Sequence, residues 1–514
     1  MIKQEGHNVR IIKNAFFLYV RMFFVLIVSL YTSRVVLDVL GVEDYGIWNV
    51  VGCVVSMFTF LGVSMSSCTS RFLSYYLGKK DFAGLQKIFS TALTVHVIIA
   101  ILFCVVCETV GLWFLNNKLI IPEDREVATM FVYQIVIVSS MISIMQVPFR
   151  GMIMAFEQMK VYAYIEVFNV CAKLLIVYLL LASPIDKLVS YGIFNLFVCL
   201  IVFIVYLSYC HSKIGVCKLI FSTEKKVMKE MVMYSLWDSY GNISCLVRTH
   251  GVSLLLNMFF TVTMNAANAI ANSVQGAIMG FASNVLSAFR PGIVKTYSVG
   301  NQQEMCGLIR KASILTSYML LLFTMPIMVE TEYILHLWLK NPPLYTATLC
   351  RWCLIFNVVA NFSCVLMAGV HATGNIRQSS FVNGSFYMLV IPVSYFAYRY
   401  GCPAEFAFIF NVFTVCVGMI QNMYVLQKYV GDFKIGLFVR NILLKFILVG
   451  ILVYGISVFL KSQLEESFLR LCVLTIFDVL LFSVMTYFWI ASEEERLILK
   501  SRVSAFVNTI FRRK

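Results

Sequence analysis

The chain has 514 residues, of which 60% are hydrophobic and only 13% are charged. A soluble domain carries roughly 25% charged residues to cover its surface. The apolar residues here fall in runs of about twenty, the length that a helix needs to cross ~30 Å of hydrocarbon. Together with a mean hydropathy of +0.84, these values exclude a soluble enzyme, a secreted disulfide scaffold and a disordered protein. The sequence predicts an all-α polytopic membrane protein.

Fourteen apolar segments are predicted to cross the membrane as helices, because a lipid-facing backbone must satisfy its own hydrogen bonds. In chain order they are residues 15–40, 47–70, 88–112, 127–149, 161–182, 188–210, 232–260, 264–289, 312–331, 345–370, 380–400, 404–427, 441–461 and 468–490.

The net charge of +15 comes from 41 Lys and Arg against 26 Asp and Glu. Alternate connections between the predicted spans carry 28 and 6 of these basic residues. Basic residues concentrate in cytoplasmic loops, so we expect both termini in the cytoplasm and read the positive charge as topology, not as a nucleic-acid surface. The outer connections are short, and no G-x-x-x-x-G-K-[ST] phosphate loop occurs. We therefore expect that the protein does not itself hydrolyse ATP and is not an enzyme. The C-x-x-C pairs Cys104/Cys107 and Cys350/Cys353 lack a second pair or nearby histidines, so no metal site is expected.

The chain contains an internal repeat. Tyr75-x-x-Gly78 followed by Gly84-Leu85-x-Lys87 returns as Tyr297-x-x-Gly300 followed by Gly307-Leu308-x-Arg310. A shift of 216 residues also carries the small and polar stripe Asn49, Gly52, Ser56, Thr59 and Ser67 onto Asn265, Asn268, Asn272, Gln275 and Ser283. Small residues common to all membrane helices are the competing explanation. Six spans separate the copies, so the repeat is parallel, about an axis along the membrane normal.

The repeat defines the predicted domains. These are an N-terminal six-helix lobe (1–210), a cytoplasmic linker (211–231), a second six-helix lobe (232–427), helices 13 and 14 (428–490), and a basic amphipathic tail on the cytoplasmic leaflet (491–514).

Three basic residues lie deep inside predicted spans: Arg34, Lys173 and Arg248. An unpaired charge at that depth costs on the order of 3 kcal/mol or more, so each should face a partner or a water-filled cavity. Asp38 lies one turn beyond Arg34, so a local ion pair competes with a cavity role there. Basic residues nearer span ends are expected to extend to the headgroups; these are Arg21, Arg351, Lys445 and Arg470.

The remaining candidate site residues are polar groups within the spans. Steps of three and four residues place the eighth-span residues Asn268, Asn272 and Gln275 on one helical face, so they are candidate cavity residues. Titratable side chains are candidates for ion coupling, and these are Asp38, Asp238 and His250.

Several stretches resemble a known family. LYTSRVVLDVLGVEDYGIWNVV (Leu30–Val51) and SRFLSYYLGKKD (Ser70–Asp81) resemble the opening of bacterial polysaccharide flippases, and Asn265–Gly300 resembles their eighth span and the loop after it. These flippases belong to the multidrug/oligosaccharidyl-lipid/polysaccharide exporter (MOP) superfamily. The resemblance implies a fold like that of its MATE transporters, with two six-helix lobes facing a central cavity and two further helices.

The resemblance also implies a function. The substrate would be an oligosaccharide repeat unit on undecaprenyl pyrophosphate, moved from the cytoplasmic to the periplasmic leaflet of the bacterial inner membrane by alternating access. The pathway would be O-antigen, capsule or exopolysaccharide biosynthesis, with other assembly proteins of the membrane as partners. Arg34 and Arg248 stand where related flippases place basic residues thought to meet pyrophosphate or acidic sugars.

Two other functions compete with this one. A multidrug antiporter of the same fold would favour cations, and its cavity should be acidic. A polytopic polysaccharide-processing enzyme such as a polymerase usually needs a large outer loop. No cofactor is implied, and transport would be coupled to H⁺, to Na⁺ or to the membrane potential.

Overall fold

The computed structural model describes residues 60–118, 123–181, 184, 186–215, 225–260, 262–339, 341–490 and 496, with scattered residues between 17 and 55. Its regular elements are helical. The first are α2 (Phe60–Gly78), α3 (Phe82–Val106), η1 (Cys107–Gly111), α4 (Leu112–Lys118), η2 (Glu123–Arg125), α5 (Glu126–Ala155), α6 (Met159–Leu180), α7 (Lys187–Tyr209) and η3 (Cys210–Ile214). The η elements are π-helical turns, except for the 3₁₀ turn η2.

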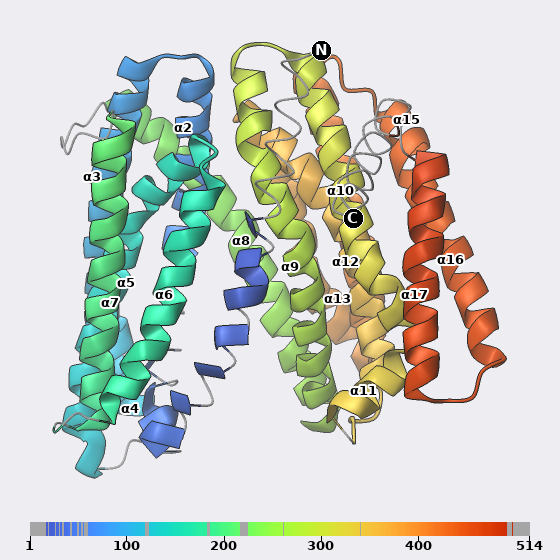
Figure 1. Ribbon diagram of the computed structural model, residues 1–514, viewed down its shortest axis with the longest axis horizontal. Helices are drawn as coiled ribbons and strands as arrows, with labels where there is room; N and C mark the ends of the chain where they lie inside the picture. The colour runs from blue at the N-terminus through green and yellow to red at the C-terminus, as the bar shows by residue number, and fades with distance from the viewer. Residues whose placement is uncertain are drawn as a thin grey trace, which may run out of the picture. The chain divides into compact units, whose positions relative to one another are not determined.

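The second half of the chain is also helical (Figure 1). Its elements are α8 (Lys225–Phe259), α9 (Val262–Ser298), α10 (Gln302–Val329), α11 (Thr331–Leu339), α12 (Thr346–Thr373), α13 (Arg377–Arg399), α14 (Phe406–Tyr429), α15 (Ile435–Phe438), η4 (Val439–Leu443), α16 (Leu444–Ser462), α17 (Phe468–Met485) and η5 (Thr486–Ile490).

Eleven helices in the described part of the chain are long and apolar enough to cross a membrane. The chain is therefore a multi-pass membrane protein, and the predicted all-α architecture is confirmed. The predicted spans from the third to the fourteenth each coincide with a described helix. In the first two predicted spans the described residues are also helical, with residues outside the described set between them. Helix α8 is not among the eleven, because Asp238, Asn242 and Arg248 lower its hydropathy.

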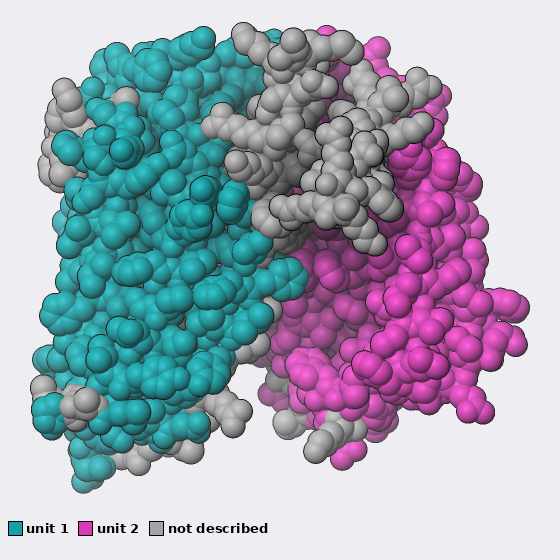
Figure 2. All heavy atoms as spheres, viewed as in Figure 1, with its two compact units in different colours: residues 1–245, 287–301, 369–384 teal, residues 246–286, 302–368, 385–514 magenta. Residues whose placement is uncertain are grey.

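The chain divides into two compact units (Figure 2). Unit 1 comprises Met1–Cys245, Ser287–Asn301 and Gly369–Gly384, and unit 2 comprises Leu246–Leu286, Gln302–Ala368 and Ser385–Lys514. Helices α8, α9, α12 and α13 contribute residues to both units. The lobe boundaries expected from the sequence stay predictions.

Helix α5 is the centre of unit 1, where it packs against α2, α3, α6 and α7 (Figure 1). The fully buried Phe103, Val132 and Tyr133 belong to its core. The Tyr133 hydroxyl donates a 2.7 Å hydrogen bond to the carbonyl of Cys107 at the π-helical turn η1. The bond fixes α5 against α3 at the point where the regular α-helical ladder of α3 ends.

Gly78 and Gly300 occupy the same place in the two copies of the repeat motif, but the structure requires glycine for a different reason at each. A Cβ added at Gly78 would lie 2.8 Å from the Cα of Lys295, so glycine permits a close approach of the α2 and α9 backbones. At the equivalent place in the second copy, Gly300 has φ +78°, a left-handed conformation that favours glycine. Near Gly78, the buried Glu157 forms a 2.7 Å ion pair with Lys295.

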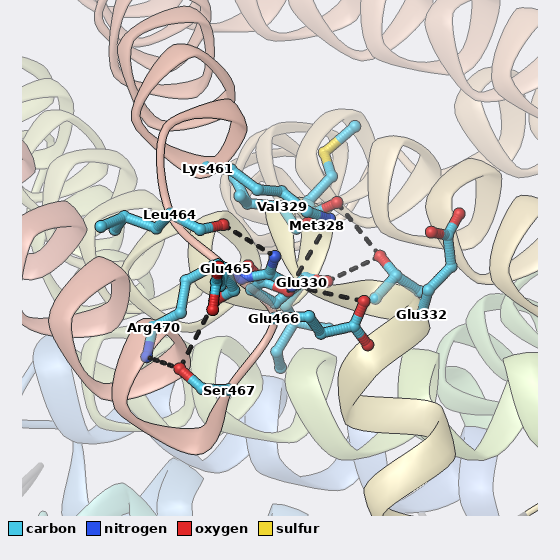
Figure 3. A network of polar contacts seen from close by, with 12 residues as sticks. Met328, Val329, Glu330, Glu332, Lys461, Leu464, Glu465, Glu466, Ser467 and Arg470 are labelled. Atoms are coloured by element: carbon cyan, nitrogen blue, oxygen red, sulfur yellow. Dashed lines mark hydrogen bonds and ion pairs between the residues drawn. The ribbon is translucent and has the colours of Figure 1, made fainter.

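In unit 2 the α16–α17 hairpin packs against α10 and is tied to its end by an ion-pair cluster (Figure 3). The fully buried Glu330 accepts a 2.9 Å hydrogen bond from Nη2 of Arg470 and forms an ion pair with Nε of the same residue at 2.8 Å. Lys461 Nζ lies 3.7 Å from the carboxylate. The expectation that Arg470 extends to the headgroups is wrong, because its side chain is only 8% exposed and is fixed by Glu330. We call Glu330, Lys461 and Arg470 the hairpin anchor.

Candidate functional site

Four helices of unit 2 supply residues to a small pocket around Arg248. Helix α8 brings Arg248 and Thr249, α9 brings three amide side chains, and α12 and α14 bring aromatic rings and one further amide. The lining residues that carry polar or aromatic groups are Arg248, Thr249, Asn268, Asn272, Gln275, Trp352, Phe356, Phe408 and Asn411. We call this the Arg248 pocket.

Arg248 is held in the pocket by rings and by an amide. Its guanidinium carbon lies 4.6 Å from the ring centroid of Phe356 and 4.9 Å from that of Tyr387, and its Nη1 donates to Asn411 Oδ1 at 3.4 Å. Cation–π contacts of this kind gain strength when they are removed from water, and Arg248 is only 8% exposed. The structure therefore fixes a buried positive charge beside hydrogen-bonding groups.

The three predicted amides of α9 do lie together in this pocket. Asn268 is buried, and its Oδ1 accepts a 3.1 Å hydrogen bond from Asn272. The backbone carbonyl of Gln275 accepts from Asn357 at 2.9 Å, which fixes α9 against α12. The cavity has a volume of about 30 Å³, which is room for a water molecule but not for a sugar.

Lys173 lines a second, larger pocket inside unit 1. This cavity has a volume of about 210 Å³ and is formed by α5, α6 and α7 with Trp48. The Lys173 side chain is exposed, and the polar residues around it are hydroxyls and amides. They are Ser139, Ser140, Ser143, Gln146, Asn169 and Asn195. We call this the Lys173 pocket.

The two pockets share positions in the internal repeat. Three pairs of lining residues lie 216 positions apart: Val136 and Trp352, Ser140 and Phe356, and Asn195 and Asn411. The offset is the one that relates the polar stripes of the second and eighth spans. Each half of the repeat thus encloses a polar pocket at corresponding helix positions.

A third polar cluster lies in unit 1 around Asp238, which is buried in α8. The Asp238 Oδ1 lies 3.6 Å from Nε2 of His371 at the end of α12, and its Oδ2 accepts a 3.2 Å hydrogen bond from Asn242. Asn242 also donates to Ser64 of α2 at 3.1 Å, and Ser67 lies 3.4 Å from Nδ1 of His371. The cluster joins α2, α8 and α12 through side chains within unit 1.

Two arginines act electrostatically on this cluster. Arg290 of α9 interacts with both Asp238 and His371, and Arg71 of α2 interacts with His371. Arg71 also donates to the Ala372 carbonyl at 3.4 Å. The ring of Tyr234 packs edge-on against the imidazole of His371, with 5.8 Å between the ring centroids.

The remaining predicted site residues lie elsewhere. Arg34 falls outside the described residues, so its pairing with Asp38 stays a prediction; Asp38 itself is exposed. His250 is also exposed and does not line the Arg248 pocket, because two residues along a helix turn the side chain about 200° away from Arg248. Among the described residues, no group of three or more His, Cys, Asp or Glu could hold a metal ion.

Sequence reasoning missed the residues that hold Arg248 and Asp238 in place. The rings of Phe356 and Tyr387 look like ordinary apolar residues of their spans, and Asn411 is one amide among many. The spacing of 216 between Asn195 and Asn411 is a signal in the sequence that could have found the amide. No comparable signal pointed to His371.

Comparison with known proteins shows the fold. No protein-family model and no curated protein matches the sequence. A solved MATE structure in a bent conformation has a TM-score of 0.71 at 14% identity, covering 83% of this chain and 97% of that one. An outward-facing multidrug resistance MATE family transporter of the MOP superfamily has a TM-score of 0.70 at 13% identity, covering 83% and 96%.

A third solved structure is a MOP superfamily transporter from Pyrococcus furiosus Vc1 (DSM3638). It has a TM-score of 0.67 at 13% identity, covering 82% of this chain and 96% of that chain, and reverse polarity of its binding pocket is described as suggesting a different function. The chain has the fold of the MATE transporters of the MOP superfamily.

Proposed function

We propose that this protein is a lipid-linked oligosaccharide flippase. It would move undecaprenyl-pyrophosphate-linked repeat units from the cytoplasmic to the periplasmic leaflet of a bacterial inner membrane by alternating access, with both termini in the cytoplasm. The product would enter O-antigen, capsule or exopolysaccharide assembly. The observation that carries the proposal is the buried Arg248, held among amides in a transporter fold.

The chemistry of the Arg248 pocket suits this substrate. A guanidinium presents a planar set of donors that matches phosphate oxygens, and it stays charged when buried. The amides of Asn268, Asn272 and Gln275 can donate to and accept from sugar hydroxyls. Because the cavity of about 30 Å³ is too small for a sugar, the substrate must enter after the pocket opens, as an alternating-access cycle requires.

The charge of the pocket also favours this function over multidrug export. An antiporter for cationic drugs needs acidic groups where the drug binds, whereas Arg248 is the one charged side chain among the described residues that line the Arg248 pocket. The P. furiosus transporter, with its pocket of reverse polarity, is a precedent for linking pocket charge to a change of function within this fold. The prenyl tail needs no pocket, because it can stay in the lipid.

We propose further that Asp238 and His371 couple transport to protons. A carboxylate 3.6 Å from an imidazole can share a proton with it. Arg71, Arg290 and Tyr234 face the same pair, so the charge that the pair carries is sensitive to its surroundings.

The substrate proposal is tested in cells that need this protein to make surface polysaccharide. Arg248→Ala should abolish export while the protein remains in the membrane at normal abundance. Arg248→Lys should keep part of the export, because the charge survives and the planar fork is lost. Wild-type export by Arg248→Ala would rule out a substrate role for this residue.

The coupling proposal is tested in proteoliposomes with an imposed pH gradient. Asp238→Asn should remove the part of transport that follows the gradient and leave downhill transport in place. His371→Gln should act in the same direction, and the exposed His250→Gln is the matched control. An unchanged gradient dependence in Asp238→Asn would exclude this pair as the proton carrier.

A further inference from the structure

A third cavity lies in unit 2, away from the Arg248 pocket. Its volume is about 530 Å³, and it is bounded by the start of α10, the segment from residue 432 to residue 445 and the turn η5 after α17. Three basic residues line it, Arg310, Lys434 and Lys445, against one acid, Asp432. The cavity therefore carries an excess of positive charge that suits an anion.

The rest of the wall is apolar and continues onto exposed apolar surface. Phe438 and Ile442 line the cavity, and beside them on α16 the side chains of Leu444, Ile447 and Leu448 are 41–53% exposed. In a membrane protein such exposed apolar side chains face acyl chains. One end of the site thus suits a charged group, and the surface beside it suits hydrocarbon.

Two π-helical turns contribute to the same cavity. The turn η4 supplies Asn441 and Ile442, and the turn η5 supplies Ile490. Short π-helical segments inside α-helices occur frequently at functional sites. The backbone thus departs from regular α-helix on both sides of the cavity.

The charge bias of the sequence predicts where the cavity sits in the membrane. Lys434 belongs to the connection 428–440, and Arg310 belongs to the connection 290–311. Both connections are on the basic side, which is predicted to be cytoplasmic. The cavity is then at the level of the cytoplasmic headgroups, and basic pockets between membrane helices on that side bind anionic headgroups.

We propose that this cavity binds the phosphate headgroup of an anionic phospholipid of the cytoplasmic leaflet. Arg310, Lys434 and Lys445 would contact the phosphate, and the acyl chains would lie along η4 and α16. The Lys445 Nζ already donates to the Trp489 carbonyl at 2.6 Å, so this amine is fixed at the cavity wall. The site is separate from the Arg248 pocket and does not depend on the transported substrate.

The test measures lipid binding to the purified, delipidated full chain by native mass spectrometry. Phosphatidylglycerol is the anionic probe, phosphatidylcholine is the zwitterionic probe, and inorganic phosphate is the lipid-free probe. The wild type should retain phosphatidylglycerol in preference to phosphatidylcholine. Lys434→Gln and Arg310→Gln should each weaken phosphatidylglycerol binding about fivefold, the effect of removing one basic charge near anionic lipid.

The repeat offers a matched control. Lys87 stands in the first copy of the motif where Arg310 stands in the second, and it is exposed. Lys87→Gln should leave phosphatidylglycerol binding unchanged. Unchanged binding in both Lys434→Gln and Arg310→Gln would overturn the proposal. Displacement of the lipid by millimolar inorganic phosphate would overturn it in favour of a free-phosphate site.

Discussion

Unit 1 and unit 2 each have a polar pocket with one deep cation, and the two cations differ in burial. Arg248 in unit 2 is 8% exposed and is held by two rings and Asn411, whereas Lys173 in unit 1 is exposed in a cavity of about 210 Å³. The cations also come from non-equivalent helices, α8 and α6. The repeat thus places lining residues of the two pockets at corresponding positions, whereas the cation of each pocket comes from a different helix.

Two clusters of ion pairs at helix ends, one in each unit, also differ in burial. In unit 2 the hairpin anchor is buried, with the Glu330 side chain 1% exposed. In unit 1 Arg125 bridges Asp44 and Asp186 at 2.6 and 2.5 Å, and the Arg125 and Asp186 side chains are 26% and 33% exposed. Because solvent screens exposed charges, the hairpin anchor should be more sensitive to loss of a charge than the cluster around Arg125.

The largest effect is expected at the hairpin anchor. Glu330→Ala leaves Arg470 buried without its carboxylate, and breaking a buried pair in this way costs about 3–5 kcal/mol. The thermal unfolding temperature in detergent and the abundance in the membrane should both fall. Glu330→Ala with Arg470→Met should recover most of the loss, because both charges are then absent. If the single variant is as stable as wild type, the buried pair does not anchor the hairpin.

The next largest effect, on transport, is expected at Asn411, which the repeat relates to Asn195. Asn411→Leu removes the acceptor of the Arg248 guanidinium, and a hydrogen bond to a charged group contributes about 1.5–3 kcal/mol. Transport should fall about tenfold to hundredfold at normal protein abundance. The Asn195 side chain donates to the Tyr191 carbonyl of its own helix, so Asn195→Leu should change transport much less. Equal losses of transport in Asn411→Leu and Asn195→Leu would mean that both pockets contribute equally to transport.

A smaller effect is expected at Lys173. Exposed charged pairs contribute little, so Lys173→Ala should reduce transport up to about fivefold, and Lys173→Arg should be close to wild type. The assay is initial transport rate in proteoliposomes at low and high salt, since salt screens an exposed charge. A loss as large as that of Arg248→Ala, insensitive to salt, would show that the Lys173 pocket closes around its ligand.

The sequence predicts the helices well because membrane spans need long apolar segments, and it predicts the amide stripe because Asn268 and Asn272 are one helical turn apart. It does not predict which distant helix completes a site. The partners of Arg248 come from α12, α13 and α14, and those of Asp238 from α2 and α12. From the sequence, Arg470 looks like a residue that reaches the headgroups, because its partner Glu330 is 140 residues away in the chain and is brought beside it only by the fold.

The smallest effect is expected in unit 1, where the contribution of the Asp186–Arg125 ion pair to stability should depend on pH. Asp186 caps α7 by accepting from the backbone N–H groups of Leu188 (3.0 Å) and Val189 (3.1 Å). Burial acts to raise the pKa of Asp186, but the Val189 N–H and the Arg125 guanidinium outweigh it and hold the pKa below its ordinary value of 3.8.

A lowered pKa means that folding favours the ionised carboxylate, so its contribution to stability is present above pH 3.8 and is lost as the pH falls through the folded-state pKa. Asp186→Asn keeps a good helix cap and removes the charge next to Arg125. The variant should unfold at a slightly lower temperature than wild type at neutral pH, and the difference should close as the pH falls below 3.8. A difference that stayed constant down to pH 3 would mean that the capping geometry, and not the Arg125 ion pair, is what Asp186 contributes.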